Sequence, residues 1–190
     1  MRVSLLLIRH CRSTGQLPEA QLTPAGAGDA ATLALELDRL GVDAVYSSPF
    51  QRARDTVLPF ARLKGLDIVF DERLIERRLA AADLPDWLDH VSRSFDDLDY
   101  RAPGGESLRE AQARGLAAMA DVALQGHRLP ALCTHGNLLS AILRSVDAGF
   151  SFNEWSALRN PDLFEIASEN GRPAAYRRLA LRQFNDRDWG

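Results

Sequence analysis

The sequence predicts an α/β protein, a three-layer α/β/α sandwich with a mainly parallel sheet and helices on both faces. Two observations lead to this fold class. Short apolar runs of strand length alternate along the chain with amphipathic helical patterns. The first run, Met1–Ile8, is almost continuously apolar, which is typical of a strand buried on both faces. With 190 residues and 46% apolar content, the chain can bury one core, so we expect a single domain over 1–190.

Strands and helices alternate through the first 70 residues. Thr23 followed by Pro24 is typical of a helix start, and Gly41 ends the apolar stripe of that helix. Pro59 lies inside the next helical pattern, where we expect a kink or a break. The expected elements are a strand at 1–8, a helix at 24–40, a strand at 42–46, a helix at 50–64 and a strand at 66–70.

The stretch 71–105 differs from its flanks. It is rich in Asp, Arg, Pro and Ala, and it carries only one short helical pattern, at about 85–91. Long, weakly structured segments in compact domains are often lids or binding loops, so we expect a lid or insertion over a site. Trp87, Phe95 and Trp155 either line that lid or pack in the core.

The alternation resumes after the lid. The apolar pattern predicts helices at 107–124 and 138–146, separated by a strand at 130–134. The turn dipeptide Asn170-Gly171 then favours a closing antiparallel pair of strands at 163–167 and 174–181.

Composition excludes several function classes. The formal charge of −3 is spread widely and no Lys/Arg block suggests nucleic acid. The N-terminal apolar run of about six residues is far below the roughly 20 of a membrane span, and no secretory signal pattern surrounds it. Cys11 and Cys133 are too few for a disulfide framework, so we expect a cytoplasmic, reduced protein. The sequence leaves the oligomeric state open.

Two histidines occupy equivalent positions. His10 and His135 each follow an apolar strand and precede a turn of small residues. If the two strands are neighbours in a parallel sheet, both imidazoles face one crevice at its carboxyl edge. Arg9 and Arg52 would add planar guanidinium groups, which match phosphate geometry. A neutral imidazole can attack phosphorus to give a phosphohistidine, and an alkoxide leaving group then needs a carboxylic acid as proton donor.

A zinc site is an alternative use of the same residues. Cys133 and His135 have Cys-x-His spacing, and His10-Cys11 could supply two more ligands. Neighbouring residues on a strand point to opposite faces, however, and no Cys-x-x-Cys motif is present. We therefore expect no metal.

The motifs resemble those of the histidine phosphatase superfamily, branch 1, which includes the cofactor-dependent phosphoglycerate mutases and many phosphomonoesterases. The resemblance spans most of the chain and implies the phosphoglycerate mutase-like fold. Its specificity lies in the order and spacing of the segments, since each alone would be weak. In chain order they are Arg9-His10-Cys11, Leu22-Thr23-Pro24-Ala25-Gly26, Ser47-Ser48-Pro49-Phe50-Gln51-Arg52-Ala53, Leu74-Ile75-Glu76-Arg77, Pro103-Gly104-Gly105-Glu106-Ser107 and Thr134-His135-Gly136-Asn137.

The resemblance implies a role for each matching residue. His10 would be the phosphorylated nucleophile, and Glu76 would protonate the leaving oxygen and later deprotonate the attacking water. His135 would contact phosphate as an imidazolium or as an N–H donor. No metal and no cofactor are implied. The full set of expected substrate- and phosphate-binding residues is Arg9, Ser13, Gln16, Arg52, His135 and Gly136.

Three features depart from the family pattern. Cys11 replaces the Gly of the first motif, so its side chain either points away from the phosphate or narrows the pocket. Gln16 replaces an Asn that is common in the mutases, and its longer amide can make a similar hydrogen bond. Residues 77–80 lack the Gly and aromatic residues usual after the acid, which leaves Asp83 and Asp86 as alternative proton donors.

The expected function is metal-independent hydrolysis of a small phosphorylated metabolite through a phosphohistidine at His10. Phosphoryl transfer of the phosphoglycerate mutase type is a second hypothesis. It usually needs more cationic residues in the lid, and seven Asp residues between 71 and 99 offset the lid arginines here. A third hypothesis, a non-catalytic module that binds phosphate or phosphopeptides, is disfavoured because both histidines, both arginines and an acid are present.

Overall fold

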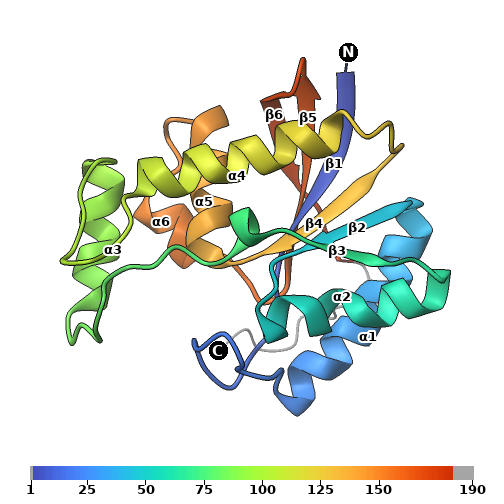
Figure 1. Ribbon diagram of the computed structural model, residues 1–190, viewed down its shortest axis with the longest axis horizontal. Coiled ribbons are helices and arrows are strands. Elements are labelled where there is room, and N and C mark those ends of the chain that lie inside the picture. Colours follow the sequence, from blue (N-terminus) through green and yellow to red (C-terminus); the bar gives the residue numbers. More distant parts are fainter. Residues whose placement is uncertain (1, 182–190) are drawn as a thin grey trace.

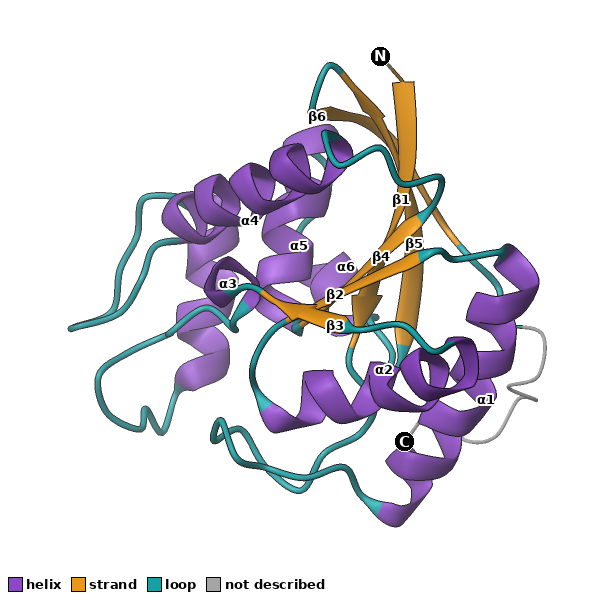
Figure 2. Ribbon diagram, turned by 45° about the vertical axis from the view of Figure 1, so that its right-hand side comes forward, coloured by secondary structure: helices purple, strands orange, loops and turns teal. Residues whose placement is uncertain are grey.

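The computed structural model describes residues 2–181 and contains one six-stranded sheet with helices on both faces (Figure 1, Figure 2). The strand order is β3-β2-β4-β1-β5-β6. The strands are β1 (Arg2–Arg9), β2 (Ala44–Ser47), β3 (Ile68–Phe70), β4 (Pro130–Thr134), β5 (Asp162–Glu169) and β6 (Arg172–Arg178). The expected α/β sandwich is confirmed, and Met1 of the expected first strand lies outside the described residues.

The sheet is mixed, with its parallel part at the centre. β1 pairs in parallel with β4, β4 with β2, and β2 with β3, whereas β5 and β6 add an antiparallel edge. In the central pair, Arg9 of β1 lies opposite Thr134 of β4. Because this is the last residue of each strand, His10 and His135 leave the sheet side by side.

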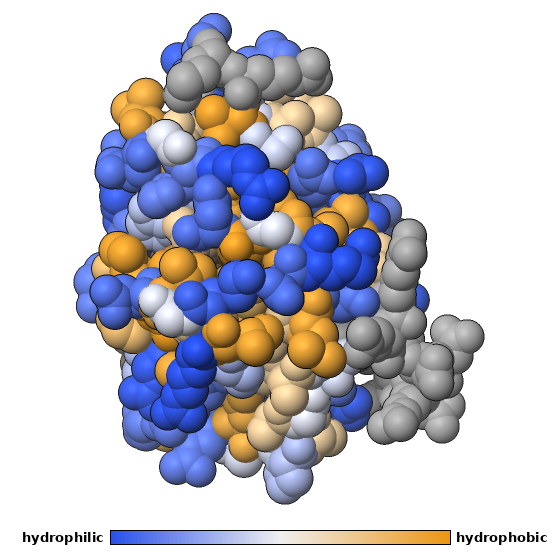
Figure 3. Space-filling view, turned by 90° about the vertical axis from the view of Figure 1, so that its right-hand side faces the viewer, coloured by the Kyte–Doolittle hydropathy of each residue, from blue (hydrophilic) through white to orange (hydrophobic). Residues whose placement is uncertain are grey.

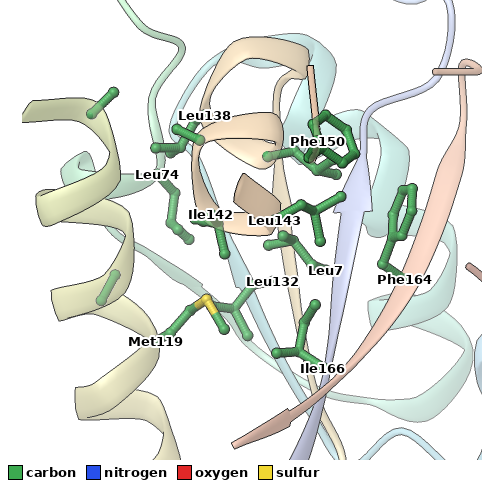
Figure 4. Packing of buried hydrophobic residues seen from close by; sticks show 14 of the residues in the cluster. Leu7, Leu74, Met119, Leu132, Leu138, Ile142, Leu143, Phe150, Phe164 and Ile166 are labelled. Carbon is green, nitrogen blue, oxygen red and sulfur yellow. The ribbon is translucent and has the colours of Figure 1, made fainter. Parts of the chain in front are cut away.

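The two central strands are buried on both faces. Leu5 and Leu7 of β1 pack in a cluster with residues of α4 (Leu108–Ala123) and α5 (Gly136–Val146). Figure 4 shows Leu7 within this cluster. Leu6 and Ile8 pack in a second cluster with α1 (Pro24–Leu40) and α2 (Gln51–Lys64). This burial explains the continuous apolar run, since both side-chain directions of the strand are covered.

The ends of α1 follow the sequence signals. The Thr23 hydroxyl accepts a hydrogen bond from the backbone N–H of Gly26 at 3.0 Å, and Gly41 adopts the left-handed conformation with φ 77°. The second helix differs: α2 continues through Pro59 to Lys64, so of the expected kink or break the break is wrong, and the kink stays a prediction. Val57 and Phe60 are fully buried on either side of this proline, so tertiary packing holds the helix together.

The segment 71–105 contains more helix than expected. A 3-10 turn, η1 (Glu72–Leu74), is followed by an extended stretch and by α3 (Trp87–Asp96). Its two legs are joined by a hydrogen bond from the backbone N–H of Ala81 to the Pro103 carbonyl at 3.1 Å. α3 lies beside α6 (Phe152–Ser156) at the left of Figure 1. That this segment covers the site stays a prediction, and lid is used below only as a name for residues 71–105.

The surface mixes polar and apolar residues. Some apolar side chains, such as Leu35, Leu63 and Phe70, are at least half exposed to solvent. Figure 3 shows hydrophobic residues interspersed with hydrophilic ones on one side of the molecule. Among the helices of residues 2–181, none combines the length and apolar character needed to cross a bilayer.

Candidate active site

His10 and His135 meet at the carboxyl ends of β1 and β4. Their ring centroids are 5.1 Å apart, with an angle of 63° between the ring planes. The backbone N–H of His10 donates to the Thr134 carbonyl at 3.0 Å, which continues the pairing of the strands by one residue. His10 is 6% exposed and His135 is fully buried, so the pair lies within the protein rather than on its surface.

The neighbours of His10 fix its tautomer. Nδ1 lies 2.7 Å from the Cys11 carbonyl oxygen, which can only accept, so Nδ1 carries the proton. Nε2 therefore has a free electron pair, and the Nε of Arg52 donates to it at 3.1 Å. Burial, opposed by the Cys11 hydrogen bond and reinforced by the charges of Arg52 and Arg9, lowers the pKa of His10 to about 3. His10 is thus a neutral imidazole at pH 7.

Arg52 is fully buried and holds the loop that follows β1. Its Nη1 donates to the carbonyls of Gln16 and Leu17, at 3.0 and 2.9 Å. Thr56, one turn further along α2, accepts from the backbone N–H of Cys11 at 2.9 Å. Through these contacts, α2 places one guanidinium against the His10 ring and fixes the loop around it.

Arg9 approaches the site from β1. Its Nη1 donates to the Leu158 carbonyl at 2.9 Å, while its buried Nε has no protein partner among the described residues. Gly136 makes this approach feasible, because a Cβ there would lie 3.3 Å from three guanidinium atoms of Arg9. The small residue after His135 therefore leaves the space that the Arg9 guanidinium fills.

His135 is neutral. Burial is the main cause that brings the pKa of His135 well below its usual value, and the positive charges of Arg52, Arg114 and Arg9 add to it. Of the two forms expected for His135, the neutral N–H donor fits this environment, and its contact with phosphate stays a prediction. Its Nε2 lies 2.8 Å from the Ser48 hydroxyl, and its buried Nδ1 has no protein partner in the part of the chain described. When Ser48 donates to Nε2, the ring proton lies on Nδ1 and is free for a ligand.

The Glu76 carboxylate contacts the N-terminus of α5, the helix that directly follows His135 in the chain. Its carboxylate accepts from the backbone N–H groups of Asn137 and Leu138, both at 3.2 Å, and of Arg77 at 2.8 Å. Asp83 and Asp86, the alternative acids, are exposed on the lid, and Asp86 lies 3.4 Å from His90.

The remaining candidates contact the loop rather than the histidines. The Ser13 hydroxyl donates to the Gly15 carbonyl at 2.9 Å, and the exposed Gln16 meets Arg52 through its backbone carbonyl. A phosphate-binding role of Ser13 and Gln16 stays a prediction. Cys11 is fully buried, and burial raises the pKa of its thiol to about 12.

Two residues that support the site were not expected from the sequence. Ser48 lies within a recognised motif, but nothing in the sequence links its hydroxyl to His135. Asn160 donates from its side-chain amide to the His10 carbonyl at 2.7 Å, across 150 positions of sequence. Within residues 2–181, no group of three or more His, Cys, Asp or Glu is arranged to hold a metal ion.

The fold and the paired histidines flanked by two arginines define a histidine phosphatase. The model of the histidine phosphatase superfamily (branch 1) matches residues 5–177, and the chain belongs to this family.

Several named proteins resemble the chain. A putative phosphoserine phosphatase 2 of Hydrogenobacter thermophilus is 29% identical, over 87% of this chain and 89% of that protein. A probable phosphoglycerate mutase of Shigella dysenteriae is 30% identical over 67% of this chain, and the match spans 64% of that protein's length. Among solved structures, a mycobacterial glucosyl-3-phosphoglycerate phosphatase with inorganic phosphate superposes with a TM-score of 0.74 at 23% identity, covering 94% and 96% of the two chains.

Proposed function

We propose that the protein is a phosphomonoester hydrolase that acts through a phosphohistidine at Nε2 of His10. One observation carries this proposal: the Cys11 carbonyl holds the proton on Nδ1, so Nε2 presents a free electron pair. A pKa of about 3 keeps this imidazole neutral at every physiological pH. An uncharged, fixed imidazole is the nucleophilic form that attack on phosphorus requires.

The surrounding donors fit a phosphoryl group. Arg9 Nε and His135 Nδ1 are buried without protein partners in the described chain, and Arg52 already reaches His10 Nε2. A bound phosphoryl group would take the Arg52 hydrogen bond away from Nε2 and accept from the other two groups. Donors held in place before the reaction stabilise the charge on the equatorial oxygens without reorganisation.

The reaction balances with one carboxyl group. Nε2 of His10 bonds to phosphorus as the ester P–O bond breaks, and protonated Glu76 gives its proton to the leaving oxygen. Water then attacks the phosphohistidine and gives a proton to the Glu76 carboxylate, and the N–P bond breaks to release inorganic phosphate. The position of Glu76 beside the His135 turn, with Asp83 and Asp86 exposed on the lid, supports Glu76 as this acid.

The substrate we propose is a small phosphorylated metabolite. The names of the relatives, a phosphoserine phosphatase and a glucosyl-3-phosphoglycerate phosphatase, support this class. Phosphoglycerate mutase-type transfer is the second candidate, because one relative is a probable phosphoglycerate mutase. We propose no nucleic-acid or membrane partner. A cytoplasmic location is consistent with Cys11 and Cys133, which are free buried thiols.

The test is turnover of an aryl phosphate and an alkyl phosphate, with and without a chelator. We expect the same rate in both conditions, and a phosphorylated intermediate that is labile to acid. His10→Ala should lose at least about a thousandfold in kcat because it removes the nucleophile. His127→Ala is the matched control. His127 lies on the loop before β4, and its ring is hydrogen-bonded to the Tyr46 hydroxyl. A His10→Ala variant that retains its rate would refute the mechanism, as would a chelator that abolishes turnover.

A further inference from the structure

The residue after the acid is a buried arginine. Arg77 is 2% exposed, although its neighbour Arg78 is exposed to solvent. Its backbone N–H donates to the carboxylate of Glu76 at 2.8 Å. The guanidinium turns the other way, donating from Nε to the Glu106 carbonyl at 2.9 Å and from Nη1 to the Ser94 hydroxyl at 2.7 Å. One residue thus connects Glu76, α3 and the segment before α4.

This placement is costly for stability alone. Burial lowers the pKa of Arg77, and its Nη2 is buried without a protein partner among the described residues. In residues 2–181 no carboxylate forms an ion pair with it, and the charged groups that face it are Glu76 and Glu106, the latter already paired with Arg114. A well-packed apolar side chain is often at least as stable as a buried charge in such a position.

The two hydrogen bonds of the Arg77 guanidinium hold the backbone next to Glu76 from two sides, α3 and the segment before α4. Ser94 belongs to α3, and its hydroxyl in turn donates to the Val91 carbonyl at 2.6 Å. Glu106 directly follows the lid, and its backbone N–H also donates to the Arg78 carbonyl at 2.8 Å. Release of either contact would free the backbone at Arg77, and the carboxylate of Glu76 hydrogen-bonds to that same backbone.

We propose that Arg77 is a positioning residue for Glu76, and that it couples the docking of α3 to the placement of the proton donor. This inference rests on the proposed hydrolysis with Glu76 as acid. Arg77 would act through its protein contacts, since its guanidinium donates to the Glu106 carbonyl and the Ser94 hydroxyl. With the guanidinium in place, the Glu76 carboxyl group is held at the leaving oxygen. Without it, the phosphate-binding groups stay in place and the proton donor does not.

The experiment compares leaving groups in matched variants. Arg77→Met keeps much of the side-chain volume but removes both hydrogen bonds, Arg77→Lys keeps the charge, and Ser94→Ala removes only the link to α3. Arg78→Ala is the control at the neighbouring exposed position. Each protein is assayed with an alkyl phosphate, whose leaving group needs protonation, and with an aryl phosphate, whose leaving group does not.

For Arg77→Met we expect kcat on the alkyl phosphate to fall by about tenfold to a hundredfold, since a general acid contributes at least that much. The loss on the aryl phosphate should stay below about threefold, and inhibition by inorganic phosphate should not change. Ser94→Ala should show the same difference between the two substrates, but a smaller one. Arg77→Lys should retain more kcat on the alkyl phosphate than Arg77→Met, and Arg78→Ala should match the parent on both substrates.

Equal losses on both substrates in Arg77→Met and Ser94→Ala would mean that Arg77 is merely structural, and unchanged rates would mean that it does nothing for the acid. Either result overturns the proposal. Should Arg77→Met fail to fold, Ser94→Ala and Arg77→Lys decide the question by the same ratio. Failure of the proposed hydrolysis is seen separately, because His10→Ala would then retain turnover.

Discussion

At the scale of single residues, the site depends on polar groups whose hydrogen-bond partners are fixed before substrate binds. His10 has an acceptor on one ring nitrogen and a donor on the other, at 2.7 and 3.1 Å. His135 has one partnered and one unpartnered nitrogen. Neutral rings in these arrangements support the two roles that we propose, a nucleophile for His10 and a hydrogen-bond donor for His135.

The identity of the acid is a prediction at this scale. Glu76→Gln keeps the size of the side chain but cannot give a proton. We expect it to reduce kcat on alkyl phosphates by about a hundredfold or more, and on aryl phosphates much less, because only the alkoxide needs protonation. Asp83→Asn and Asp86→Asn, in exposed lid positions, serve as controls and should keep the parental ratio. If Asp83→Asn or Asp86→Asn instead reduces kcat more on alkyl than on aryl phosphates, that aspartate is the acid.

The buried histidines also predict how stability depends on pH. Below about pH 6.5, the unfolded chain protonates these rings, whereas folded His10 resists until about pH 3. The unfolded state then binds more protons, so the free energy of unfolding falls as the pH drops through this window. The pKa of His135 is shifted in the same direction.

Thermal unfolding between pH 7.5 and pH 4.5 tests this. The Tm of the parent should fall across the range, and the Tm of His10→Gln should fall by several degrees less, because one buried titrating ring is gone. His127→Gln, at a half-buried position, is the control. Identical slopes for the parent and His10→Gln would contradict the depressed pKa.

At the scale of elements, the start of α1 is packed directly on the loop that follows His10. A Cβ at Gly26 would lie 2.1 Å from the Arg12 carbonyl oxygen, closer than any packing allows. Gly28, two residues further along the same helix, has nothing within 4 Å of that position. The two glycines therefore have different reasons to be present.

Alanine substitutions at Gly26 and Gly28 should change the free energy of unfolding in opposite directions. Gly28→Ala should stabilise the protein by about 0.5–1 kcal/mol through helix propensity. Gly26→Ala should destabilise it by more than that and weaken inhibition by inorganic phosphate, because the loop carrying Ser13 and Gln16 must shift. Denaturant unfolding and phosphate inhibition measure both effects. If Gly26→Ala bound phosphate like the parent, the loop would not depend on this contact.

Elements with strong periodicity could be predicted from the sequence, and those fixed by tertiary contacts could not. Leu5, Leu6 and Leu7 are buried on alternate faces of the sheet, and this is visible in the sequence as a continuous apolar run. The five-residue helix α6 has too few positions for a period, and α3 runs to Asp96, beyond the expected pattern. The break at Pro59 did not occur because packing outweighs local propensity.

The same distinction applies to the site. His10, Arg52 and His135 could be placed together because motifs at strand ends meet at one edge of a parallel sheet. The contacts of Ser48 and Asn160 could not, since a hydrogen bond between distant segments leaves no local pattern. The neutral state of His135 also required the structure, because it results from burial.

At the scale of the whole molecule, four of the five lid arginines are engaged with the protein itself. Arg73 bonds the carboxylates of Asp71 and Asp121, at 2.7 Å each. Arg101 pairs with Glu110 at 3.0 Å, and Arg93 lies over the ring of Tyr100. Arg77 is buried. Within the described chain, Arg78 alone among the five lid arginines is exposed without such a contact, so the lid offers little charge to hold the carboxylate or second phosphate of a mutase intermediate.

This arrangement predicts that the phosphoryl group goes to water. With a phosphorylated metabolite as substrate and excess glycerate as acceptor, inorganic phosphate released should equal substrate consumed within about 10%, since a poorly held acceptor competes weakly with water. Phosphate release and phosphorylated products are measured in the same time course. Arg73→Ala, which frees Asp71 and Asp121, should leave this ratio unchanged, because its guanidinium is committed to those carboxylates. Transfer to glycerate in more than about half of the turnovers would show instead that the closed site retains its phosphoryl group long enough to act as a mutase.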